Sequence, residues 1–132
     1  MKVLTIKEPW ASLIIKGLKE YEFRSWKTSY RGRLLIHAGK HVEKWELERF
    51  KNYNLDYGHG EIIGEVKLTD CILVDEQMDR ALRKAKEDIY KNDHVGQYAW
   101  KLENPLIYKD RIKIKGSLGL WNYKKSLHNN CL

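Results

Sequence analysis

The chain has 132 residues, which is enough for one domain with a single hydrophobic core. Its 42% hydrophobic and 33% charged residues are typical of a soluble globular protein, and no apolar run approaches the ~20 residues that a membrane-spanning helix needs. The formal net charge of +7 favours anionic partners, nucleic acid above all, although charge alone does not identify one.

The beginning of the chain and its cysteines predict a cytoplasmic location. Residues 1–5 lead directly into an apolar strand pattern without an apolar leader or a cleavage site, so we expect no secretory signal. Cys71 and Cys131 stand alone, without the spacing of a metal site or a redox pair. Two free thiols in a reducing cytoplasm are the simplest interpretation.

The first half of the chain alternates between strand and helix patterns. Residues 2–7 predict a strand, and Pro9 fits the first turn of a helix with Trp10, Leu13, Ile14 and Gly17 on one face. Further segments follow in chain order: a strand over 21–26, an apolar strand over 34–38, and a helix over 42–50 whose 3.6-residue period includes Trp45.

The second half predicts more strands around one charged helix. A glycine-rich loop over 57–60 leads into a strand over 61–68, in which Gly64 indicates a bulge or a close backbone approach. The remaining predicted elements are a helix over 75–90 and strands over 98–102, 111–114 and 120–123.

About six strands with two or three inserted helices imply an α+β chain built as a small, partly closed β-barrel. We find no linker and no internal repeat, so we expect a single domain over 1–125 and a polar, frayed tail over 126–132.

The segment from Gly17 to Arg24 carries the strongest indication of a site. In a strand over 21–26, Glu22, Arg24 and Trp26 share one face, and Lys19 lies in the turn that precedes it. A carboxylate and a guanidinium about 6.5–7 Å apart along a strand can hold one small polar ligand between them. The alternative is a surface ion-pair ladder, which contributes little energy.

Read together, several segments resemble the ASCH domain, a relative of the PUA fold. The resemblance covers nearly the whole chain and rests on the order and spacing of its motifs. These are Pro9-Trp10-Ala11, Gly17-x-Lys19-x-x-Glu22-x-Arg24, Tyr30-Arg31-Gly32, Leu35-Ile36-His37-Ala38, Ile62-Ile63-Gly64-Glu65-Val66, the run from Tyr98 to Pro105, and the run from Lys115 to Trp121.

This resemblance implies a cleft lined by the Gly-x-Lys-x-x-Glu-x-Arg motif and a function in binding or processing RNA. Some bacterial members are amidohydrolases that deacylate the exocyclic nitrogen of cytidine, using a lysine that matches Lys19 to activate a threonine nucleophile, assisted by a distal glutamate. Here Glu22 stands at the threonine position. Hydrolysis would therefore need Glu22 as a general base on water, with Lys19 at the oxyanion. The distal glutamate could be Glu65, Glu76 or Glu87.

Aromatic and arginine side chains extend the candidate site. Trp10, Trp26 and Trp100 could stack on a base or fill the core, and Trp10 is the best placed to border a cleft. Trp45 and Trp121 are expected in the core. Arg31 and Arg33, beside Gly32, could contact phosphate or form a solvated corner.

The sequence predicts no metal or cofactor site. His37 and His41 are four residues apart, but a strand followed by a glycine does not bring them onto one helical face. His37 is better interpreted as a buried histidine satisfied by the backbone. There is also no phosphate-binding glycine loop and no Ser/His/Asp pattern.

Three functions remain open at this stage. The favoured one is an RNA- or nucleoside-binding module that uses Lys19, Glu22 and Arg24 with Trp10, Trp26 and Arg31. The second is an amidohydrolase acting on N4-acylated cytidine through Lys19 and Glu22. The third is a protein-interaction module with an acidic partner.

Overall fold

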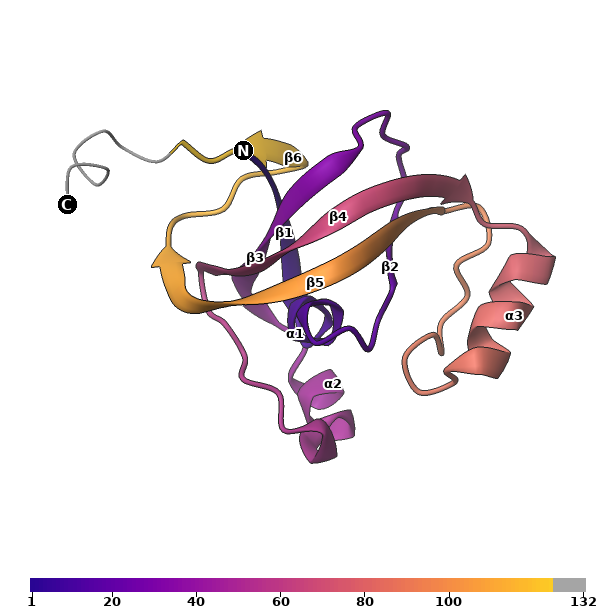
Figure 1. Ribbon diagram of the computed structural model, residues 1–132. Helices are drawn as coiled ribbons and strands as arrows, with labels where there is room; N and C mark the ends of the chain where they lie inside the picture. Colours follow the sequence, from indigo (N-terminus) through magenta and orange to yellow (C-terminus); the bar gives the residue numbers. More distant parts are fainter. Residues whose placement is uncertain (125–132) are drawn as a thin grey trace.

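The computed structural model describes residues 1–124, which form one six-stranded mixed sheet with helices attached (Figure 1). The strands are β1 (Lys2–Glu8), β2 (Tyr21–Arg24), β3 (Gly32–Val42), β4 (Glu61–Leu73), β5 (Tyr98–Lys113) and β6 (Leu120–Asn122). The helices are α1 (Trp10–Ile15), α2 (Lys44–Arg49) with a 3₁₀ turn at Lys51–Tyr53, and α3 (Glu76–Ala85). The predicted α+β class and strand number are confirmed; the predicted tail over 126–132 and Cys131 lie outside the described residues.

The sheet order is β2–β5–β4–β3–β1–β6, and α1 packs across its middle strands. Because side chains alternate along β1, Leu4 and Ile6 join the core beneath α1, whereas Val3 belongs to a second cluster on the opposite face. A third cluster, around Phe50 and Tyr90, lies on the outer side of α1. The helix is therefore enclosed by apolar side chains on two sides.

The sheet remains open within the described residues, because its edge strands β2 and β6 do not pair with each other. One side chain nevertheless bridges β2 and β1. β6 pairs with β1 only as far as Leu4, and the next carbonyl, that of Thr5, accepts a hydrogen bond of 2.9 Å from the Arg24 guanidinium. Arg24 thereby fixes where β2, which carries the site motif, lies relative to β1.

Bulges allow the long strands to curve. The β3–β4 and β4–β5 ladders both shift register close to Gly64. A Cβ atom on Gly64 would lie well inside contact distance of the Leu106 carbonyl and 2.9 Å from Ile15 Cδ1. The predicted close backbone approach at Gly64 is thus confirmed.

Two local predictions need correction. The strands predicted over 98–102 and 111–114 are one strand, β5, because the ladder with β4 continues through register shifts past the interruption at Asn104-Pro105. Trp45 is 74% exposed and does not belong to the core, since α2 is a short helix with no buried residue. Trp121 is half-buried and packs with the second cluster, as expected.

Candidate functional site

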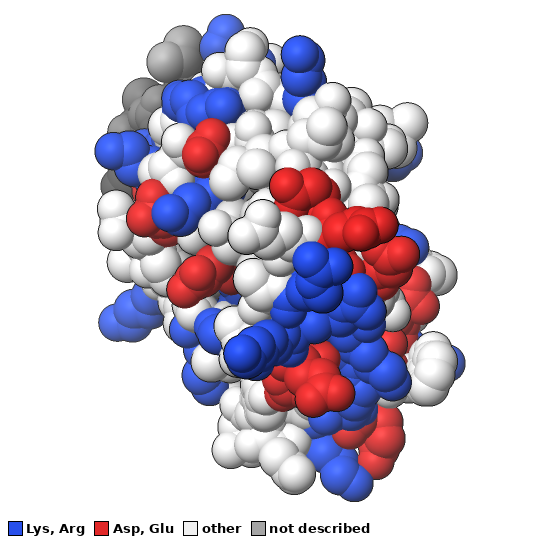
Figure 2. Space-filling model, turned by 90° about the vertical axis from the view of Figure 1, so that its right-hand side faces the viewer, with Lys and Arg blue, Asp and Glu red and all other residues white. Residues whose placement is uncertain are grey.

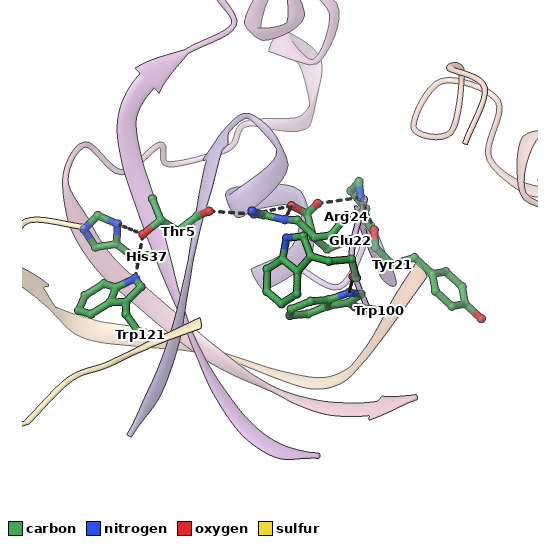
Figure 3. A network of polar contacts seen from close by, with 9 residues as sticks. Thr5, Tyr21, Glu22, Arg24, His37, Trp100 and Trp121 are labelled. Carbon is green, nitrogen blue, oxygen red and sulfur yellow. Dashed lines mark hydrogen bonds and ion pairs between the residues drawn. The ribbon is translucent and has the colours of Figure 1, made fainter. Parts of the chain in front are cut away.

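The predicted motif residues converge on the carboxylate of Glu22. Its Oε1 atom lies 3.6 Å from the Lys19 ammonium, and its Oε2 atom lies 2.9 Å from the guanidinium of Arg24. Figure 3 shows Glu22 beside Arg24, with Arg24 continuing to Thr5 on β1. The arrangement follows from alternation in β2, which places Glu22 and Arg24 on the same face of the strand.

Lys19 is unusually enclosed for a lysine, with only 5% of its side chain exposed. Its Nζ atom lies 4.8 Å from the Phe23 ring centroid, 5.7 Å from that of Tyr90 and 5.9 Å from that of Trp10. It also donates a hydrogen bond to the Tyr21 carbonyl. Burial lowers the Lys19 pKa, and the neighbouring Glu22 carboxylate partly opposes that shift.

A cavity of about 220 Å³ opens beside this ion pair. It is smaller than the ~300–1,000 Å³ typical of sites for drug-sized ligands, so it suits a single ring or base. The residues that line it are Trp10, Lys19, Glu22, Phe23, Ile89, Asn92, His94 and Gln97.

The far side of the cavity comes from the loop between α3 and β5, which the sequence did not mark as functional. The His94 ring stacks on Phe23 with centroids 3.7 Å apart and planes 4° apart. His94 Nδ1 lies 3.0 Å from Gln97 Oε1, and a carbonyl oxygen only accepts, so Nδ1 carries the proton and Nε2 is the acceptor. Burial lowers the His94 pKa, which favours this neutral ring.

The structure places other predicted site residues outside this cavity. Trp26 is 36% exposed and makes an edge-to-face contact with the fully buried Trp100, whose indole donates to the Trp26 carbonyl. Trp100 is therefore a core residue. Arg31 donates to the carbonyls of Thr28 and Tyr30 and lies 3.9 Å from Asp70, so it orders its own turn.

None of the three candidate distal glutamates lines the cavity. Glu65 pairs with Arg33 at 2.9 Å and accepts from Tyr108, and these contacts lower its pKa. Glu76 is exposed at the start of α3, and Glu87 is exposed after it. The lining residues also include no serine or threonine, so the threonine nucleophile of the amidohydrolases has no counterpart there.

The positive charge of the chain is not spread evenly over its surface. Figure 2 shows the face that carries α3, where a block of lysine and arginine side chains is bordered by acidic ones. Two ion pairs lie along α3, Arg80 with Glu76 at the surface and Arg83 with the buried Asp79. This face is therefore a mixed surface and not a uniform basic patch.

Within residues 1–124, no group of three or more histidine, cysteine or acidic side chains is arranged to hold a metal ion. In the same part of the chain, no helix has both the length and the apolar character needed to cross a membrane.

The family model of the ASCH domain matches residues 4–110. The chain belongs to the ASCH domain family. It is 30% identical to Activating signal cointegrator 1 of Mus musculus and 29% identical to that of Homo sapiens, in each case over 137 residues. These alignments cover 95% of this chain but 22% of each relative, so the chain spans about a fifth of their length.

A solved structure of ASCH from Zymomonas mobilis has a similar fold, with a TM-score of 0.60. The match covers 94% of this chain and 87% of that one at 15% identity. At this identity the likeness establishes the ASCH fold, which is PUA-like, and does not extend to activity.

Proposed function

We propose that this ASCH domain binds RNA or a modified nucleoside by taking one base into the cavity beside Lys19. The observation that carries the proposal is the buried Lys19–Glu22 pair at a cavity of about 220 Å³ bordered by the Trp10 ring. A flat heterocycle can bury its faces against aromatic and apolar side chains there while its edge meets polar ones.

The polar groups of the cavity offer both donors and acceptors to a base edge. An ammonium has three N–H donors, and in Lys19 one of them is given to the Tyr21 carbonyl. Glu22 Oε1 pairs with the ammonium at 3.6 Å, which is longer than a hydrogen bond, so donor capacity remains for a ligand. The Nε2 atom of neutral His94 is an acceptor, and the Asn92 amide offers both kinds of group.

Amidohydrolysis of an N4-acylated cytidine is the second candidate, and the lowered pKa of Lys19 favours it. A neutral lysine amine could take part in proton transfer, which a permanently charged one could not. Both oxygens of Glu22, however, are engaged by Lys19 and Arg24. Both cations stabilise the charged carboxylate, whereas a general base must become protonated during the reaction; binding requires no such change.

Two tryptophans provide a matched test of the binding site. We expect Trp10→Ala to weaken binding of a short single-stranded RNA by about 5- to 150-fold, the equivalent of the ~1–3 kcal/mol of one stacked base. Trp45→Ala, which removes an exposed indole on α2, should leave affinity unchanged. Fluorescence anisotropy measures both, and thermal unfolding confirms that each variant is folded. Equal affinities of the two variants would overturn the proposed site.

The two candidate functions separate on one substrate. Incubating the protein with N4-acetylcytidine and following cytidine by liquid chromatography should show no release of cytidine. Rapid release of cytidine that excess RNA does not inhibit would replace the binding proposal with the hydrolase.

A further inference from the structure

A cavity of about 880 Å³ lies away from the Lys19 site. Thr5 and His37, partners in the β1–β3 ladder, belong to its lining. Each lies two residues after Val3 or Leu35 in its strand, so its side chain points to the same face of the sheet, opposite α1. The cavity therefore opens on the face that the ASCH motif does not use.

The charged side chains around this cavity are all basic. Lys40, Lys113 and Lys115 line it together with His59, and no aspartate or glutamate is among the lining residues. Within residues 1–124, none of these three lysines takes part in an ion pair. Three unpaired cations around one hollow repel each other and attract a multivalent anion such as phosphate.

The polar side chains at the floor of the cavity already have hydrogen-bond partners within the protein. His37 Nε2 lies 2.7 Å from the Ile114 carbonyl, which only accepts, so Nε2 carries the proton and Nδ1 accepts from the Thr5 hydroxyl at 3.1 Å. Trp121 Nε1 in turn donates to Thr5 Oγ1 at 3.0 Å. Figure 3 shows these three side chains together. A ligand would consequently find its polar partners at the lysine rim and not at the floor.

An apolar surface adjoins the basic rim. Leu118 is 98% exposed and, with Ile114, contributes to the wall of the cavity. A ligand that matches both features carries a phosphate and a flat group with an apolar face. A nucleotide has this combination, whereas inorganic phosphate lacks the second part.

We propose that this cavity is a second binding site, for a nucleotide whose phosphate lies at Lys40, Lys113 and Lys115. The nucleotide could be free or part of an RNA strand. The proposal does not depend on the Lys19 cavity holding a base. A chain of polar contacts links the two sites: Glu22 of the first cavity pairs with Arg24, which donates to the carbonyl of Thr5, a residue that lines the second cavity.

The test compares two double variants with the same change in net charge. Lys113→Gln/Lys115→Gln alters the cavity, and Lys84→Gln/Lys91→Gln alters exposed lysines that line neither cavity. Calorimetry with 5′-CMP, cytidine and inorganic phosphate tests the free nucleotide, and the salt dependence of binding to a short single-stranded RNA tests the strand. Both series are repeated in Lys19→Met protein, so that the two sites are assessed separately.

We expect 5′-CMP to bind more tightly than cytidine or inorganic phosphate, and only Lys113→Gln/Lys115→Gln to abolish that advantage. If the site holds RNA, the log–log salt slope should fall by about 0.7 for each phosphate that the variant no longer neutralises, or about 1.4 for the pair. Identical behaviour of the two double variants in both series would overturn the proposal. So would equal binding of 5′-CMP and inorganic phosphate, which would indicate a simple anion site. If Lys19→Met alone loses cytidine binding, that result supports the Lys19 cavity as a nucleoside site and does not affect the proposal for the second cavity.

Discussion

Replacing Glu22 by glutamine is the sharpest perturbation of the candidate site, because it removes the carboxylate that forms ion pairs with both Lys19 and Arg24. Lys19 is 5% exposed and Glu22 is 12% exposed, so the pair is largely withdrawn from water. Arg24 is 24% exposed and retains some access to solvent. The substitution keeps the shape of the side chain, removes its charge and replaces one acceptor oxygen by an NH2 donor.

The expected loss of stability follows from the ion pairs that Lys19 and Arg24 lose in this variant. Removing one partner of a buried ion pair typically destabilises a protein by ~3–5 kcal/mol. We expect Glu22→Gln to lower the free energy of unfolding by about 3 kcal/mol, at the low end of that range, because the cavity adjoins the pair and Arg24 can be solvated. Lys19→Met should cost about 1 kcal/mol, since its aromatic surroundings accept an apolar side chain of similar size.

The loss should depend on pH in a definite direction. Burial lowers the pKa of Lys19 below 10.5 in the folded protein. Its contribution to stability is therefore present above pH 10.5 and is lost as the pH falls through the folded pKa. Glu22→Gln lowers that folded pKa further, so its deficit is largest near neutral pH and shrinks as the pH approaches 10.5.

Urea unfolding at several pH values measures these quantities, and a double-mutant cycle isolates the pair. The combination of Lys19→Met with Glu22→Gln should be more stable than the sum of the single losses predicts, by about 2 kcal/mol. Additive losses, or a Glu22→Gln protein within ~0.5 kcal/mol of the parent at neutral pH, would refute the reasoning.

Two further predictions concern backbone packing and protonation. Gly64→Ala should destabilise the fold by about 3 kcal/mol, at the upper end of the range for overpacking, because the new methyl group meets the Leu106 carbonyl, which cannot move without disturbing the ladder; an unchanged midpoint of thermal unfolding would contradict this. His94, whose pKa is lowered by burial, contributes stability that is present above pH 6.5 and lost as the pH falls through its folded pKa. The stability of the parent should therefore fall below pH 6.5 more steeply than that of His94→Gln, and parallel pH profiles would contradict the buried neutral ring.

The sequence allowed one half of the cavity to be predicted. Lys19 and Glu22 line the cavity, and strand alternation brings Arg24 onto the same face as Glu22, with which it pairs. His94 and Gln97 come from a loop about 70 residues further along the chain. They reach the site because β2 pairs with β5, directly after that loop, and no local pattern in the sequence specifies this long-range pairing.

The wrong predictions for Trp45 and for the end of the strand at residue 102 also arise from tertiary structure that the local sequence does not specify. The helical period that includes Trp45 is genuine, but a helix of six residues packs too little surface to bury a large side chain there. The interruption at Asn104-Pro105 marks a point at which β5 shifts its register and continues. The role of Gly64 was predictable, since a glycine inside an apolar strand often marks a bulge or a close backbone approach, and both occur here.

The central claim is that a base enters the cavity beside Lys19, and NMR titration with a short single-stranded RNA tests it most directly. We expect the largest chemical-shift changes at the Trp10 indole N–H, the His94 ring and the side-chain amides of Asn92 and Gln97. The Trp45 indole N–H, on exposed α2, should remain unaffected. Saturable binding that leaves the cavity signals unchanged, or no binding at all, would contradict the claim.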